Sequence, residues 1–255
     1  MKKEIVKTVL LALIIPVLVV LAWFLTTNFG NMPQSLLPKI SQVIKIFIDM
    51  CKKGQLQSDL GISLIRVLKG FLISAVTGIL LGSIMGMSKT AAEILQPTIT
   101  VLRQIPIMAW IPLIILWCGI GETSKIVIIV LASFFPILVN TMSGISQTPQ
   151  GYIEVASLYK LNKTKTFFKV YLPHALPGIF TGLKLGLGIS WMAVVGAEMI
   201  AATSGIGYRM SDARNLMRSD IVIACMIVIG IIGMLMDKVI GILFNICMPW
   251  EKSKK

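Results

Sequence analysis

Long apolar blocks separated by short charged segments dominate the chain. The stretches that lack any charged side chain include residues 9–25, 70–88, 104–121, 126–153 and 221–236. Blocks of about 20 residues match the length of a helix that crosses a hydrocarbon layer of about 30 Å. Because lipid offers the backbone no hydrogen-bond partners, each such block must form a helix. The pattern therefore predicts an all-α membrane protein.

We expect six transmembrane helices in a single transmembrane domain that covers residues 1–255. Their approximate ranges are 9–27, 64–88, 98–119, 125–143, 178–201 and 221–246. The first block could instead be a secretory signal, because Lys2 and Lys3 precede it. However, it is long, contains Pro16, and is followed by Trp23 and Phe24 rather than by a small-residue cleavage site. A retained first span is therefore favoured.

Residues 40–50, between the first two spans, carry apolar side chains at helical spacing with Lys45 and Asp49 among them. This spacing predicts an amphipathic helix. The helix would either lie on the membrane surface or pack on the outer ends of the spans.

Composition and charge agree with a membrane protein and suggest its orientation. Hydrophobic residues make up 56% of the chain, charged residues 14%, and the mean hydropathy is +0.86. A net charge of +13 would suggest nucleic-acid binding in a soluble protein. Here the basic residues lie mostly at span ends, so we expect no nucleic-acid partner. An even number of spans puts both termini on one side, and that side has the more basic loops. Both termini and residues 149–177 are therefore predicted to be cytoplasmic.

The segment of about residues 149–177 is unusually polar for a connection between two apolar blocks. Pro149 and Pro173 bracket it, and we predict two short helices between them. Glu154 lies in the first turn, where a carboxylate stabilises the helix dipole. Asn162 can adopt the left-handed conformation that ends this helix, and Thr164 can cap the next. The lysines of the segment also suit a solvated connector near anionic lipid.

The order of motifs in this segment resembles the "EAA" loop of binding-protein-dependent ABC importers. Glu154-Val155-Ala156 is followed at a typical distance by Leu172-Pro173-His174. Motifs elsewhere resemble the nitrate/sulfonate/taurine branch of these permeases, in this order: Leu37-Pro38, Arg103-Gln104-Ile105-Pro106, Ala109-Trp110-Ile111-Pro112, Leu116 to Gly121, Phe134 to Ile137, Ala197-Glu198 and Gly205 to Asn215. The resemblance covers nearly the whole chain and implies the type I ABC importer permease fold.

The resemblance implies that the loop is a coupling helix that docks on a cytoplasmic ATPase subunit. The docking residues that it implies are Glu154, Val155, Ala156, Lys160, Leu161, Asn162, Leu172 and Pro173. Two positions depart from the family pattern, which has alanine where Val155 stands and glycine where Lys160 stands. Glycine allows a tight turn without steric cost. Lys160 therefore implies that Asn162 takes the turn or that the first helix runs longer.

Charges and prolines inside the spans indicate a translocation path. Lys184 and Glu198 lie in the fifth span, where charges are costly unless they face protein or water. Glu198 could be an outer gate or could pair with Arg209 or Arg214, and Lys184 could likewise belong to a structural ion pair. The residues predicted for the path or gate are Pro106, Trp110, Pro112, Glu198, Arg214 and Asn215.

Prolines should interrupt two spans. Pro97, Pro106 and Pro112 are expected to break the third span, and Pro136 the fourth, because proline removes a backbone hydrogen bond. In the fifth span, the glycines are expected to allow close helix packing. These are Gly182, Gly186 and Gly188.

No catalytic or metal-binding group of residues is expected. His174 is the only histidine, and the four cysteines lack metal-type spacing. The segment from Gly119 to Lys125 has the wrong spacing for a phosphate-binding loop. We therefore expect no cofactor on this chain and ATP–Mg on a separate ATPase subunit.

The sequence thus favours a permease subunit of an ATP-driven importer in a bacterial inner membrane. The resemblance implies a homodimer, two ATPase subunits and an extracytoplasmic substrate-binding protein. It favours a small anion such as a sulfonate, taurine or nitrate, with a vitamin-precursor pyrimidine as the alternative. Two other functions remain open at this point. A stand-alone secondary transporter or channel would place charges near the midplane, and an intramembrane enzyme would need a convergent catalytic set.

Overall fold

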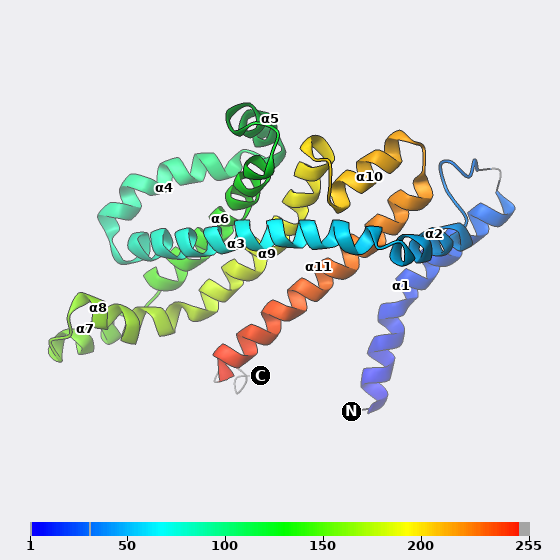
Figure 1. The fold of residues 1–255 in the computed structure, drawn as a ribbon. Helices are drawn as coiled ribbons and strands as arrows, with labels where there is room; N and C mark the ends of the chain where they lie inside the picture. The colour runs from blue at the N-terminus through cyan, green and yellow to red at the C-terminus, as the bar shows by residue number, and fades with distance from the viewer. Residues whose placement is uncertain (1, 31, 250–255) are drawn as a thin grey trace.

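The computed structural model describes residues 2–30 and 32–249, and within them the chain is helical and contains no strand. Figure 1 shows an elongated bundle crossed by one long helix, α3 (Gln55–Met87). The short helix α7 (Gln150–Leu158) lies at one end of the bundle and α2 (Ile40–Lys52) at the other. The fold is therefore all-α, as predicted.

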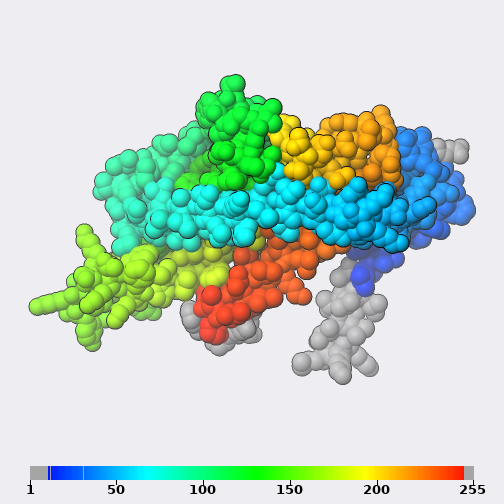
Figure 2. All heavy atoms as spheres, viewed as in Figure 1, coloured from blue at the N-terminus to red at the C-terminus, as the bar shows by residue number. Residues whose placement is uncertain are grey.

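Three helices form the packed core: α3, α6 (Glu122–Ser146) and α9 (Leu172–Ala201). α6 lies between the other two and contacts both along most of its length. Its inward residues Ile129, Ile137 and Ile145 are fully buried. Many large apolar side chains point away from this core and are exposed, among them Leu68, Leu72 and Leu80 of α3, the helix that crosses the face shown in Figure 2. An apolar exterior is what a lipid-facing or partner-facing surface requires.

Glycines allow the three core helices to approach closely. On α3, a Cβ added to Gly82 would lie 2.6 Å from the backbone oxygen of Leu138 on α6. On α9, the corresponding atom on Gly182 would lie 3.1 Å from the backbone oxygen of Pro136, and on Gly186 2.9 Å from the Ile137 side chain. Gly182 and Gly186 thus have the predicted packing role. The prediction was wrong for Gly188, which is exposed and has no neighbour within 4 Å.

A buried hydrogen bond between two hydroxyls adds a polar contact to this apolar interface. Ser133 Oγ on α6 lies 2.8 Å from Ser74 Oγ on α3, and Ser74 donates to the carbonyl of Val130 at 2.8 Å. Both serines are fully buried. Hydroxyl bonds of this kind fix the register of adjacent membrane helices without placing a charge in lipid.

Within the described residues, four helices are long and apolar enough to cross a membrane: α3, α6, the run Lys163–Ala201 that ends in α9, and α11 (Ser219–Cys247). The pair α4 (Lys89–Gln104) and α5 (Ile107–Cys118) would together make a fifth. In α1 (Lys2–Phe29), the apolar stretch Leu13–Phe29 is shorter. The predicted count of six spans remains a prediction.

The predicted third span is two helices that meet at 97°. Ile105 is extended (φ −73°, ψ 119°) because the ring of Pro106 disfavours helical geometry at the residue before it. The expectation that the prolines break this span is thus met at Pro106 alone. Pro97 lies inside α4 and Pro112 inside α5. Pro136 likewise lies inside a continuous α6, so the predicted break in the fourth span was wrong.

The amphipathic segment forms α2, which packs against α11 and α3. Val43 and Met50 are the buried residues of its apolar side. This is the second of the two predicted arrangements, in which the helix covers the ends of the spans. α1 leans away from the bundle (Figure 1) and is tied to the segment before α2 by a hydrogen bond from Trp23 Nε1 to the Pro38 carbonyl at 3.0 Å.

The close approach of α3 and α6 yields a stability prediction. Gly82→Ala should destabilise the fold by about 1–3 kcal/mol, because the backbone of α6 must move to admit one methyl group. The measurement is thermal unfolding of the purified protein in detergent. Gly188→Ala is the matched control, since it adds the same methyl group to an exposed helical position. Equal midpoints for the two variants would contradict the close-packing account.

Candidate functional site

The loop at the α7 end of the bundle has a defined geometry. α7 ends with Lys160 in the left-handed conformation at φ 51°. The N–H of Leu161 donates to the carbonyl of Ala156 at 3.0 Å, and the N–H of Lys160 donates to Ser157 at 2.9 Å. This pair of bonds is the Schellman motif, which usually places glycine where Lys160 stands.

The two expected consequences of Lys160 were therefore both wrong. Lys160 itself takes the turn, whereas Asn162 is extended and caps α8 (Lys163–Thr166). The Asn162 side chain accepts a hydrogen bond from the N–H of Lys165 at 2.8 Å. Thr164, predicted as this cap, lies within α8. Asparagine suits the capping position because its oxygen reaches the free N–H groups of the first turn.

α7 presents apolar side chains to the outside. Tyr152, Val155, Leu158 and Tyr159 are 59%, 50%, 81% and 78% exposed, and we call these four residues the coupling surface. Ala156 is buried, and Glu154 is exposed on the same helix. An exposed group of large apolar residues on a projecting helix is typical of an interaction site.

A groove of about 400 Å³ runs beside the coupling surface. Residues of α7 form one wall, and Leu161, Lys169 and Pro173 contribute to the other. The second wall belongs to the π-helical turn η1 (Phe167–Tyr171) and the start of α9. Leu172, the remaining predicted docking residue, is half-buried at the first position of α9. The predicted docking residues thus lie on α7, on its turn, and where the chain enters the core.

A second hollow lies at the bend between α4 and α5. This bend cavity has a volume of about 420 Å³. Its lining includes Arg103, Pro106, Trp110, Asn140, Leu185 and Ile189, from α4, the bend, α5, α6 and α9. Pro106 and Trp110 of the predicted path therefore share one cavity, whereas Pro112 is exposed on α5 outside its lining.

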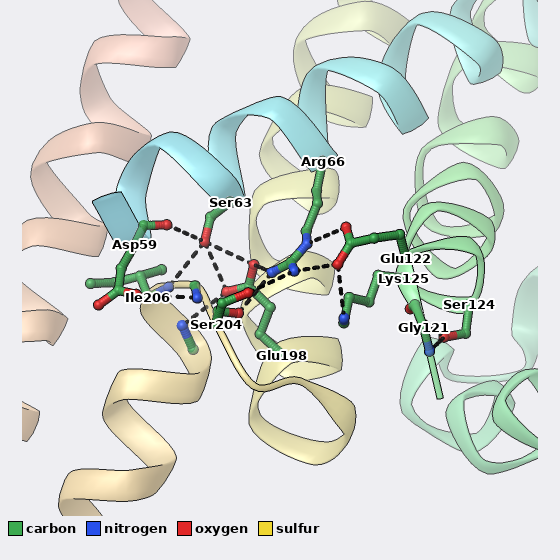
Figure 3. Close-up of polar contacts among 12 residues, drawn as sticks. Asp59, Ser63, Arg66, Gly121, Glu122, Ser124, Lys125, Glu198, Ser204 and Ile206 are labelled. Atoms are coloured by element: carbon green, nitrogen blue, oxygen red, sulfur yellow. Dashed lines mark hydrogen bonds and ion pairs between the residues drawn. The ribbon is translucent and has the colours of Figure 1, made fainter. Parts of the chain in front are cut away.

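A network of buried charges joins the helices at the end opposite α7 (Figure 3). Arg66 on α3 contacts Glu198 on α9 at 2.7 Å and Glu122 on α6 at 2.5 Å. Arg66 is 3% exposed and Glu198 1%. Ser63 Oγ lies 2.8 Å from both carboxylate oxygens of Glu198. The Gly207 N–H donates to the same carboxylate at 3.0 Å.

The neighbouring ion pair extends this network. Asp59 contacts Arg209 on α10 (Ile206–Asn215) at 2.7 Å and accepts a hydrogen bond from the Gly205 N–H at 3.3 Å. Gly205 has φ 108°, and a Cβ there would lie 2.4 Å from the Glu198 carboxylate. Only glycine therefore fits between α9 and α10 at this point.

Both charges predicted inside the fifth span are in ion pairs. Glu198 pairs with Arg66 rather than with Arg209 or Arg214, and Lys184 pairs with Asp237 on α11 at 3.2 Å. Arg214 and Asn215 are exposed at the end of α10. The predicted path residues thus occupy four separate places: the bend cavity, the exposed surface of α5 at Pro112, the buried network and the exposed end of α10. A gating role for Glu198, Arg214 or Asn215 remains a prediction.

Residues 78–250 match the family described as "Binding-protein-dependent transport system inner membrane component". The chain belongs to this family. It is similar to a putative ABC transporter permease protein of Methanocaldococcus jannaschii, with 39% identity over 98% of this chain and 95% of the relative. A putative aliphatic sulfonates transport permease of Bacillus subtilis is 34% identical, over 94% of this chain and 87% of the relative. A nitrate import permease of Synechocystis sp. is 37% identical, over 95% of this chain and 90% of the relative.

A solved amino acid ABC transporter gives the same result for the fold. It has a TM-score of 0.59 at 18% identity and covers 78% of this chain and 96% of that chain. The permease therefore has the type I ABC importer permease fold, as the sequence predicted. The family consists of transport subunits, which agrees with the expectation that the permease is not an enzyme.

Sequence reasoning missed most of the buried network of the permease. Asp59, Ser63 and Arg66 follow one another at helical spacing of four and three residues, so they lie on one face of α3. That spacing was a usable signal, because charged and hydroxyl residues rarely share one face of a span without a partner. Glu122 gave no such signal, since it is the first residue of α6 and so lies at the end of a candidate span rather than within it.

The buried network yields the second prediction. Arg66→Gln should destabilise the permease by about 3–5 kcal/mol, because it leaves the buried Glu198 without a counter-charge. Adding Glu198→Gln should restore part of the loss, and thermal unfolding measures both variants. Lys89→Gln, which breaks an exposed pair with Glu93 at 3.9 Å, is the control and should change little. A loss from Arg66→Gln as small as that of the control would contradict the account.

The turn after α7 yields the third prediction. Lys160→Gly should stabilise the loop by about 0.5–1 kcal/mol, because a left-handed residue with a side chain is strained and glycine is not. Hydrogen exchange at the Leu161 amide, which donates to Ala156, should slow accordingly. Asn162→Ala removes a cap one turn away and should instead speed exchange at Lys165. Faster exchange at Leu161 in the glycine variant would refute the strain argument.

Proposed function

We propose that the permease forms the translocation path of an ATP-driven importer and is driven through α7 by a separate cytoplasmic ATPase. The observation that carries the proposal is the coupling surface, four large side chains exposed on a projecting helix. The charge bias of the loops favours a cytoplasmic position for this end. The nearby lysines at positions 163, 165 and 169 add the positive charge typical of that side.

The proposed coupling is mechanical. Only the four-residue turn 159–162 separates α7 from the continuous run of α8, η1 and α9. α9 is packed along α6 with glycines at the contact. A push on the coupling surface would therefore move α9, which lines the bend cavity through Leu185 and Ile189. Two packed arrangements of such a bundle, one open to each side, would give alternating access.

The proposed assembly is a homodimer of permeases with two ATPase subunits bearing ATP–Mg and an extracytoplasmic substrate-binding protein. The exposed apolar faces of α1 and α11 provide surface for lipid and for the second copy. The proposed location is the cytoplasmic membrane of a prokaryotic cell, the inner membrane where there are two.

The proposed cargo is a small anion such as a sulfonate, taurine or nitrate, because relatives at 34% and 37% identity are named for sulfonates and nitrate. A vitamin-precursor pyrimidine is the alternative cargo.

Docking can be tested with the ATPase and binding protein co-expressed from the genome that encodes the permease. Leu158→Asp and Glu154→Arg should abolish co-elution of the ATPase and substrate-stimulated ATP turnover. The first places a charge on an apolar side chain that the partner must desolvate, and the second reverses the charge of an exposed residue on the same helix. Leu36→Asp is the matched control: Leu36 is an exposed leucine (66%) in the segment before α2. It should leave co-elution unchanged.

Uptake into vesicles that contain the permease without any ATPase would contradict the proposal and favour a secondary transporter or channel. ATP turnover in the complete assembly, compared with nitrate, taurine, an alkane sulfonate and a pyrimidine, would assign the cargo. Stimulation by the pyrimidine alone would remove the anion assignment while leaving the importer intact.

A further inference from the structure

One face of α4 is polar along the whole helix. Lys89, Glu93, Gln96, Thr100 and Arg103 recur at intervals of four and three residues, so they share one face. All five are exposed in the single chain. The neighbouring face carries Leu95, Ile99 and Leu102, of which Ile99 is buried in the core. A polar stripe on a helix within a membrane bundle needs either protein partners or water along its length.

The stripe leads into the bend cavity. Gln96 and Thr100 line a smaller cavity of about 150 Å³, and Arg103 lines both this one and the bend cavity. The two hollows are therefore adjacent and meet at Arg103. Lys89 begins α4 directly after α3 ends at Met87, on the side where α7 lies. The stripe thus runs from that end of the bundle to the bend.

Arg103 lies level with the middle of the core helices. The bend-cavity lining includes Leu131, Phe135 and Val139 from the central part of α6 and Leu185 and Ile189 from the centre of α9. Among the described residues, none forms an ion pair with Arg103, and none of those lining its two cavities is acidic. An arginine at this depth is costly unless an anion or water reaches it.

Lys184, another basic residue near the bend cavity, differs from Arg103 because it has a partner of opposite charge. It lies on α9 one residue from the cavity-lining Leu185, and Asp237 neutralises it at 3.2 Å. Arg103 has no such counter-ion in the described part of the chain. The difference indicates that the positive charge of Arg103 is kept available rather than balanced within the fold.

An anion in the bend cavity would meet a second polar side chain besides Arg103, that of Asn140. The Asn140 amide has two N–H donors and uses one for the Pro136 carbonyl at 2.8 Å. The second N–H remains as a hydrogen-bond donor. Guanidinium and amide donors together match the oxygens of a planar or tetrahedral oxyanion.

We propose that the polar face of α4 is one wall of a water-filled branch of the translocation path and that Arg103 is its anion-selecting residue. This inference rests on the proposed importer function and names the residue that favours a negatively charged cargo. Arg103 attracts the anion at the bend, and the uncharged Thr100 and Gln96 let it pass along the stripe. The single guanidinium group of Arg103 would bind an anion only weakly. Weak binding suits a translocation path, because the cargo must also leave it.

Cysteine labelling of the full-length permease in nanodiscs tests both parts of the proposal. In a background with the four native cysteines replaced by serine or alanine, Thr100→Cys is placed on the stripe and Val101→Cys on the adjacent apolar surface, where Val101 is 66% exposed. The probes are two methanethiosulfonate reagents, one bearing a sulfonate and one a trimethylammonium group. Thr100→Cys should react with both, faster with the anionic one, and Val101→Cys should react with neither.

Arg103→Gln should lower the ratio of anionic to cationic labelling rates at Thr100→Cys by about threefold or more, because one nearby positive charge is removed. Arg103→Lys should restore most of the ratio. Lys53→Gln is the charge-matched control, since it removes one positive charge from an exposed residue just after α2, outside the stripe and both cavities. It should leave the ratio unchanged.

Three results would overturn the proposal: an unchanged ratio in Arg103→Gln, equal labelling at Thr100→Cys and Val101→Cys, or a preference for the cationic reagent while Arg103 is present. The last two comparisons need no Arg103 variant, so they decide the matter even if Arg103→Gln fails to fold. The labelling uses the permease alone, so its outcome is independent of ATPase docking. Loss of docking would remove the importer function, whereas these results remove only the role of α4 and Arg103.

Discussion

The ion pair between Arg66 and Glu198 is the constraint on which the half of the permease farther from α7 depends. Two charges with almost no solvent exposure are stable only while each neutralises the other and every remaining polar atom has a partner. Ser63, the Gly207 N–H and Glu122 supply those partners. Because they come from α3, α10 and α6, the pair fixes how these helices and α9 meet.

The half nearer α7 is held by a different interaction. Between α3, α6 and α9 the contacts are mainly glycine against backbone or isoleucine, with the Ser74–Ser133 hydroxyl pair as a polar exception. Packing of this kind contains no ion pair that must break, so the helices can shift between discrete packed arrangements. A charged network far from α7 and close packing without ion pairs nearer to it suit the proposed push from the α7 side. The same bundle leaves the bend cavity between its two ends.

The coupling loop and the bend show how local chemistry shapes both working regions. Lys160 accepts a strained left-handed conformation so that α7 can end abruptly and hold Ala156 against the rest of the loop. Pro106 forces Ile105 out of helical geometry and turns α5 by 97°. One break exposes the coupling surface, and the other brings Arg103 and Trp110 to the same cavity.

The sequence by itself determined the helical membrane class, the family and the position of the short polar helices around residues 149–177, because each depends on local features: apolar block length, motif order and turn chemistry. It placed Pro106 and Trp110 in a path, and these two residues do share a cavity. Only the tertiary structure decided which charges pair. Arg66 and Glu198 are 132 residues apart, and local spacing says nothing about such a contact. It also decided that Pro106 breaks its span while Pro97, Pro112 and Pro136 remain within helices, since neighbouring helices can stabilise a helix that proline weakens.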